Sequence, residues 1–214
     1  MQHLTRHATG VRRALAAVVA VACLAFVTGC GEEGVEVSEE LSSTPGQKFS
    51  LVDEDGKPYV VGHGVVLEVP EDWTDYEPEA ESIDGSTMEW AVGQPEATLP
   101  LPAGLQFSMG VAGKGGQVDS DTGLAQAAKK IAEISPGYEL LDEGDADVPG
   151  ADVAKFLRFK RDLAYGETVV PVEQVTLMIQ VDEETSSTIR FIAPEGQWDA
   201  LMKKSYDSVK VTDG

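Results

Sequence analysis

Residues 172–193 read VEQVTLMIQVDEETSSTIRFIA, and this stretch decides the fold. Apolar side chains occupy every second position from Val175 to Val181, which is the period of a β-strand that buries one face. The acidic run Asp182–Thr185 predicts a hairpin turn, and Ser187–Ala193 predicts the next strand. Two consecutive strands joined by a short turn predict antiparallel pairing.

More strands are expected on the N-terminal side of this hairpin. Asp55-Gly56 supplies the positive backbone angles of a tight turn, so Phe49–Val52 and Lys57–Val61 predict a second hairpin. The remaining expected strands are Gly64–Val69, Thr87–Val92, Leu105–Val111, Tyr138–Leu141 and Ala151–Arg161.

Two amphipathic helices, each of about fifteen residues, must bury their apolar faces on these strands. Asp121–Ser135 carries apolar residues at helical spacing and is ended by Pro136-Gly137. A second helix is expected after Pro194-Glu195, with Trp198 on its inner face. The order of elements predicts an α+β fold in which an antiparallel sheet of about six to eight strands has a helix on each face.

The chain is strongly acidic, with 37 Asp and Glu against 16 Lys and Arg and a net charge of −21. Such a charge repels phosphate backbones, so we expect no nucleic-acid partner. With only two cysteines, the chain can form neither a disulfide scaffold nor a Cys-rich zinc site.

The first thirty residues resemble the export signal of bacterial lipoproteins. Three arginines and no acid precede residues 14–27, ALAAVVAVACLAFV, an apolar run shorter than the roughly 20 residues that span a bilayer. Val27-Thr28-Gly29-Cys30 resembles a lipobox, in which the cysteine is lipidated after cleavage. The resemblance implies a signal peptide at 1–29 and diacylglyceryl and N-acyl lipids on Cys30. Whether export is general or twin-arginine stays open.

Cleavage before Cys30 would leave 37 acids against 13 bases, a net charge of −24, and His63 as the single histidine. With one cysteine, that chain has no internal disulfide, so its fold must rest on a hydrophobic core. Residues 30–47 are rich in Glu, Ser and Gly, and we expect a lipidated acidic tether there. One domain, expected to be monomeric, follows at 48–214.

The stretch Val65–Trp73, VVLEVPEDW, resembles the strand–Pro–x–x–Trp opening of the Mog/PsbP-like fold. The order of the later elements, down to a closing Ser208–Val211 segment, is similar to that fold and to small actinobacterial lipoproteins of the LpqN type. Asp72 departs from the pattern, because many relatives have Gly there. The resemblance implies an α/β/α sandwich and a non-catalytic accessory or binding role.

No catalytic constellation is evident in the sequence. A Ser–His–Asp or Cys–His enzyme needs a histidine base, and His63 lies between glycines in a segment that we interpret as a turn. The glycine-rich run Gly110–Gly116 has no Ser or Thr after Lys114, so it predicts a loop rather than a phosphate site. We therefore expect neither enzymatic activity nor a cofactor nor a resident metal.

Residues 71–104 are the most distinctive part of the sequence, because acids alternate there with aromatic residues and prolines. Trp73, Tyr76, Glu77 and Glu79 are candidates for binding a ligand or partner, since Trp and Tyr are enriched at binding hot spots. The alternative for Trp73 is a place in the core.

We expect a lipoprotein held in the membrane by its lipid, on the extracytoplasmic face. It would bind an envelope protein, or a lipid-like or cationic small ligand, through the acidic loop at residues 71–104 or through a groove between helix and sheet. One alternative is an envelope glycan hydrolase that uses two carboxylates. Another is a surface cation-binding protein, although we interpret its candidate acidic clusters as solvated turns: Asp53–Gly56, Asp142–Asp147 and Asp182–Glu184.

Overall fold

The computed structural model describes residues 41–76, 89–97, 101–111, 121–183 and 185–212. The chain divides into two compact units, 1–33 and 34–214, and every described residue belongs to the second. Cys30, Glu77 and Glu79 lie outside the described ranges, as does most of Gly110–Gly116.

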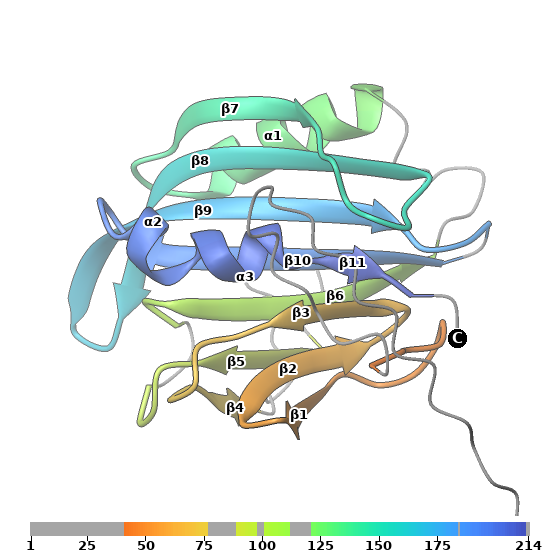
Figure 1. Cartoon of the computed structure of the whole chain (residues 1–214). Coiled ribbons are helices and arrows are strands. Elements are labelled where there is room, and N and C mark those ends of the chain that lie inside the picture. The colour runs from red at the N-terminus through yellow and green to blue at the C-terminus, as the bar shows by residue number, and fades with distance from the viewer. Residues whose placement is uncertain (1–40, 77–88, 98–100, 112–120, 184, 213–214) are drawn as a thin grey trace, which may run out of the picture. The chain divides into compact units, whose positions relative to one another are not determined.

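A seven-stranded antiparallel sheet forms the larger layer of the domain (Figure 1). Its hairpin of β9 and β10 places Leu177 opposite Ile189, and Thr185 N–H donates to Asp182 Oδ1 at 2.6 Å in the turn. The hairpin predicted from residues 172–193 is therefore confirmed. In spatial order the strands are β4 (Thr74–Tyr76), β5 (Trp90–Gly93), β6 (Gly104–Val111), β10 (Thr185–Pro194), β9 (Thr168–Gln180), β8 (Val153–Tyr165) and β7 (Glu139–Asp145).

A second sheet, of four strands, packs against the first. Its order is β1 (Ser50–Glu54), β2 (Lys57–Gly62), β3 (Val65–Glu68) and β11 (Lys210–Val211). The predicted α+β class with antiparallel strands is confirmed, and the strands divide between two sheets rather than joining one. The apolar alternation predicts which faces are buried, but it does not say which strands become neighbours.

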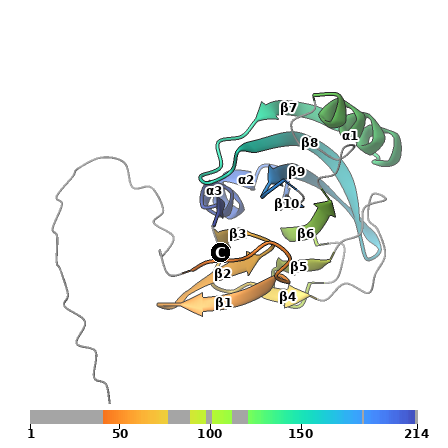
Figure 2. The same cartoon turned by 90° about the vertical axis from the view of Figure 1, so that its right-hand side faces the viewer.

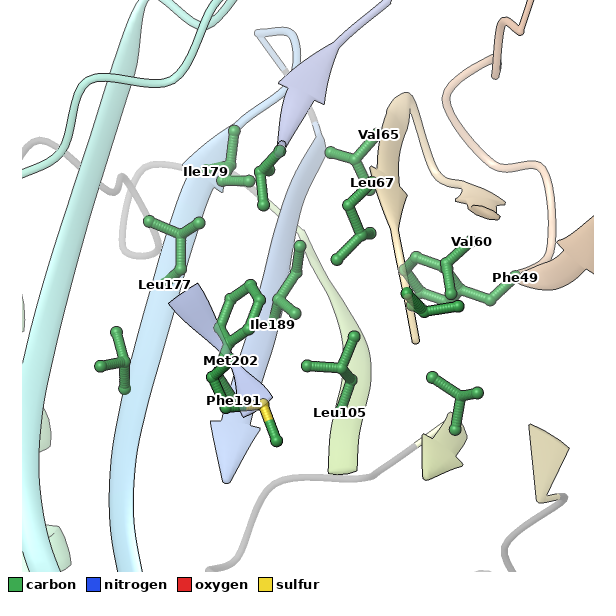
Figure 3. Close-up of a cluster of buried hydrophobic side chains, with 14 of the residues drawn as sticks. Phe49, Val60, Val65, Leu67, Leu105, Leu177, Ile179, Ile189, Phe191 and Met202 are labelled. Atoms are coloured by element: carbon green, nitrogen blue, oxygen red, sulfur yellow. The ribbon is translucent and has the colours of Figure 1, made fainter. Parts of the chain in front are cut away.

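The main hydrophobic core lies between the two sheets (Figure 3). The smaller sheet contributes Val60, Val65 and Leu67, and the larger sheet contributes side chains of β6, β9 and β10. Leu105, Leu177 and Phe191 among them are fully buried. Burial of this shared apolar surface stabilises the domain, which has no disulfide within the described residues.

Helices cover both faces of the larger sheet, as predicted (Figure 2). Helix α1 (Asp121–Ile134) packs Ile131 on Leu157 and Phe159 of β8. On the opposite face, α2 (Trp198–Leu201) and α3 (Lys203–Asp207) pack on the core.

The prediction of a single long closing helix is wrong, because the helix is interrupted at Met202, which separates α2 from α3. The φ angle of Met202 is −113°, far from the helical value of about −63°. Its side chain is fully buried, so the interruption falls where the backbone delivers a side chain into the core.

Three further features differ from the sequence-based expectation. Strands β4 and β11 were not predicted, because two or three residues are too few to show a period. Residues 142–145, which we interpreted as part of a solvated turn, belong to strand β7 at the sheet edge, where their side chains stay exposed.

The segment before β1 is packed on the domain, although the sequence places it in the tether. Leu41 packs with Tyr59, Val61 and Val66 on the outer face of the smaller sheet. Ser43 is buried: its N–H donates to Thr212 Oγ1 at 2.8 Å, and its Oγ accepts from Gly64 N–H at 3.1 Å. None of the helices in the described ranges is long and apolar enough to cross a membrane.

Candidate functional site

A hollow of about 610 Å³ opens where the start of β1 meets β4 and the residue before β5. This volume lies within the roughly 300–1,000 Å³ that is usual for small-molecule sites. We call it the acidic hollow, because two carboxylates and one amine line it. The lining residues are Lys48, Phe49, Ser50, Leu51, Asp75, Glu89 and Trp90.

The β4–β5 region supplies the two carboxylates of the acidic hollow. Asp75 lies on β4 opposite Val92 of β5, and Glu89 immediately precedes β5. The β1–β2 hairpin supplies the residues that face them. These acids stand at the two ends of the segment 77–88, which the sequence already marks as acidic.

His63 holds Glu89 from the interior of the domain. Its Nε2 lies 3.1 Å from Glu89 Oε2, and the side chains are 5% and 34% exposed respectively. His63 lies in the turn between β2 and β3 at φ +46°, so its interpretation as a turn residue is confirmed. The turn is anchored twice, because His63 N–H donates to Gln47 O at 2.7 Å and its carbonyl accepts from Ser187 Oγ at 3.1 Å.

The surroundings of the imidazole determine which nitrogen carries the proton of the neutral ring. Nδ1 of His63 is buried and has no hydrogen-bond partner among the described residues. A proton there would be an unsatisfied buried donor, whereas a proton on Nε2 is donated to Glu89. The neutral ring therefore carries its proton on Nε2, and the carboxylate of Glu89 is the acceptor.

Aromatic rings form the apolar wall of the acidic hollow. Phe49 stacks on Trp90 with ring centroids 6.4 Å apart and an interplanar angle of 15°, and it packs on His63 in a T-shaped arrangement with ring centroids 4.7 Å apart. A cation beside such rings is attracted by their quadrupole as well as by nearby carboxylates. Within the described part of the chain, no ion pair joins Lys48 to Asp75 or Glu89. The arrangement therefore suits a cationic group attached to an apolar body.

The predicted binding residues that the structure describes, Trp73 and Tyr76, do not line this hollow. Trp73 is 4% exposed and packs in the main core, as the alternative interpretation expected. Tyr76 is half-buried, and its hydroxyl accepts from Ala97 N–H at 3.1 Å and donates to Gln94 O. These contacts secure the loop after β5. The binding roles of Trp73, Tyr76, Glu77 and Glu79 stay predictions.

A smaller groove of about 270 Å³ lies between α2–α3 and the larger sheet. We call it the helix–sheet groove, and it is the kind of groove that the sequence-based hypothesis named. Arg158 crosses it: its guanidinium lies 5.5 Å from the Trp198 ring centroid and 2.5 Å from Glu173 Oε1. The lining residues are Asp142, Phe156, Arg158, Val175, Trp198, Asp199, Lys203, Tyr206 and Asp207.

The described ranges hold no group of three or more His, Cys, Asp or Glu side chains that could bind a metal ion. In two of the acidic clusters considered for calcium, the carboxylates instead secure turns. Asp53 Oδ1 accepts from Gly56 N–H at 3.2 Å in the β1–β2 turn, and Asp182 does the same for Thr185 in the β9–β10 turn.

No protein-family model and no curated protein matches this chain. Among solved structures, it is similar to LpqN of Mycobacterium tuberculosis, a protein involved in cell envelope biogenesis. The identity is 18%, the match covers 78% of this chain and 91% of that one, and the TM-score is 0.42. A protein of unknown function from Pseudomonas aeruginosa matches at 11% identity over 71% of this chain and 87% of that one, with a TM-score of 0.35. A protein from Bacteroides thetaiotaomicron matches at 9% identity over 71% of this chain and 46% of that one, with a TM-score of 0.38.

Proposed function

We propose that this chain is a membrane-anchored, extracytoplasmic binding module without catalytic activity. Its ligand, an envelope component with a cationic group on an apolar body, binds in the acidic hollow. The basic and apolar start of the sequence, followed by Val27-Thr28-Gly29-Cys30, supports export and lipid anchoring. The binding role is carried by one observation, the contact between the buried His63 and Glu89.

This contact leaves one carboxylate oxygen for a ligand. His63 occupies Oε2 of Glu89, and Oε1 has no hydrogen-bond partner within the described residues. Because the imidazole is fixed by the turn and by Phe49, the carboxylate is oriented before the ligand arrives. Preorganisation of this kind reduces the entropy lost on binding. The net charge of −21 further favours the approach of cations.

The same two carboxylates bear on the hydrolase alternative. A glycosidase needs two acids in one cleft, and Asp75 and Glu89 do share a hollow. Glu89 already has one oxygen in contact with the buried His63, and both acids are open to solvent, so we favour charge recognition over acid catalysis.

Binding of hexylammonium to the purified full chain tests the proposal, with hexanol as the uncharged control ligand. Calorimetry should detect hexylammonium and not hexanol. Glu89→Gln should weaken binding by about tenfold, equivalent to about 1.4 kcal/mol. Glu167→Gln makes the same charge change at an exposed residue of the β8–β9 turn, at the opposite end of β9 from the residues that contact the His63–Gly64 turn, and should change affinity by less than about twofold. Equal effects of the two variants would contradict a specific site.

Two further measurements test lipid anchoring and the absence of catalytic activity. Mass spectrometry of the protein from washed envelopes should find Cys30 acylated at the N-terminus, and an intact leader would contradict anchoring. Cell-wall glycans incubated with the chain should stay intact. Hydrolysis that is lost in Glu89→Gln would instead establish the carboxylate-pair enzyme.

A further inference from the structure

We propose that strand β7 is a docking edge for an extended, basic segment of a partner protein, which adds to the larger sheet as a further strand. This inference concerns the opposite end of the larger sheet from the acidic hollow and does not depend on it. Strand β7 is the last strand in the sheet order, paired only with β8 (Figure 1). Its outer backbone groups therefore face away from the sheet.

The side chains of β7 are accessible to a partner. Six of its seven residues are exposed, and Gly144 is half-buried. Leu140 and Leu141 are 42% and 38% exposed, which is unusual for large apolar residues of this domain. An added strand would cover them while it paired its backbone with β7.

The charge of the edge selects the partner. Asp142, Glu143 and Asp145 lie on β7, and the described part of the chain offers only one neutralising ion pair, between Asp145 and Lys155 at 2.8 Å. In a second copy of this chain, β7 would set acids against acids, which is unfavourable across a strand pair. Charge complementarity thus favours a segment that carries Lys or Arg.

The helix–sheet groove accommodates one side chain of such a segment. Asp142 is opposite Arg158 in the ladder and lines the groove, together with Asp199 of α2. Neither acid has an ion-pair partner within the described residues, whereas Lys203 is paired with Asp207. A volume of about 270 Å³ is below that of a usual ligand pocket but suits one long basic side chain. Trp198 and Tyr206 would contact its aliphatic stem.

A peptide of alternating Lys and Val, eight residues long, tests this edge on the full chain. Hydrogen exchange should slow by at least about tenfold at the amides of 139–145 when the peptide binds, because they become strand partners. Asp142→Asn should weaken binding by about tenfold, and Asp72→Asn, an exposed control with the same charge change, by less than about twofold. Glu89→Gln should leave this binding unchanged, which separates it from the acidic hollow.

A second peptide, with the same residues but N-methylated at alternate positions, keeps the charge and lacks strand hydrogen bonds. Its binding should be lost. Equal binding of both peptides, or protection of 139–145 caused by dimerisation without peptide, would overturn the proposal. So would an unchanged affinity of the Asp142→Asn variant. Unaltered melting of that variant would confirm that it folds.

Discussion

Two of the hairpin turns are each built on a pair of consecutive residues with positive φ. Asp55 and Gly56 lie at +53° and +79°, and His63 and Gly64 lie at +46° and +78°. Such pairs match the twist of the flanking strands, and a glycine at the second position makes them recognisable in a sequence. The turn role of His63 was predictable for this reason. Its contact with Glu89 was not, because tertiary packing alone brings those two side chains together.

Gly64 and Gly56 differ in what surrounds them, which gives a matched pair of variants. A Cβ at Gly64 would lie 2.3 Å from Val181 Cγ1, whereas one at Gly56 meets nothing within 4 Å. Gly56→Ala should lower the free energy of unfolding by about 1–2 kcal/mol from backbone strain. Gly64→Ala should lose about 1–3 kcal/mol more, because of the clash. Urea titration measures both, and equal losses would contradict the packing of Val181 on the turn.

Tyr206 makes the domain sensitive to alkaline pH. Burial raises the pKa of its hydroxyl above 10.0, and the charge of Asp207 raises it further, against a lowering by Arg158. The folded state therefore holds this proton more tightly than the unfolded chain. The associated stability is complete below about pH 10 and is lost as pH rises through the folded pKa.

Tyr206→Phe removes this contribution, so thermal melts should show a smaller fall in Tm between about pH 9 and about pH 11 than in the parent chain. Lysines that also titrate in this range affect both proteins alike. An identical fall in Tm would show that Tyr206 is no more protonated when folded than when unfolded.

At the scale of elements, the prediction succeeded where a pattern was long enough to repeat. The thirteen-residue strands β8 and β9 and the fourteen-residue helix α1 all have clear periods. Helices α2 and α3 are four and five residues long and take their positions from packing. Ser208 shows how: its Oγ accepts from Glu68 N–H of β3 at 2.8 Å and donates to Ser205 O at 2.8 Å.

Ser208→Ala tests this link between α3 and the smaller sheet. The N–H of Glu68 would lose its buried acceptor, so the free energy of unfolding should fall by about 1–3 kcal/mol. Ser50→Ala is the control, because it removes a half-buried hydroxyl whose bond to Val61 O is 3.4 Å long. That change should stay within about 0.5 kcal/mol. Similar losses in the two variants would assign no special role to Ser208.

At the scale of the whole molecule, the sequence predicts the class of fold better than it predicts where the folded domain begins. Apolar alternation predicted antiparallel strands, and two amphipathic segments predicted helices on both faces. The acidic hollow is assembled from residues far apart in the chain. Its only indication in the sequence is that Asp75 and Glu89 lie within the acid-rich stretch 71–104. Composition likewise suggested a domain that starts at position 48, although residues 41–47, which are mostly polar, make specific contacts with it.

A comparison of chains 41–214 and 48–214 tests where the folded domain begins. The shorter chain loses the packing of Leu41 on the smaller sheet and the acceptors of two backbone donors, Ser43 Oγ for Gly64 and Gln47 O for His63. Each unsatisfied buried N–H costs about 1–3 kcal/mol, so the loss of two acceptors should lower the free energy of unfolding by about 2–6 kcal/mol.

The same deletion should also disturb the acidic hollow. Gln47 holds the turn that carries His63, and His63 in turn orients Glu89. We therefore expect 48–214 to bind hexylammonium more weakly than 41–214 even under conditions where both are folded. Ser43→Ala in the longer chain separates the effects: it should reduce stability through Gly64 and leave binding nearly unchanged, since the bond from His63 to Gln47 remains. Equal unfolding midpoints and equal affinities of the two chains would instead place the start of the domain at position 48 and leave Glu89 oriented without the preceding segment.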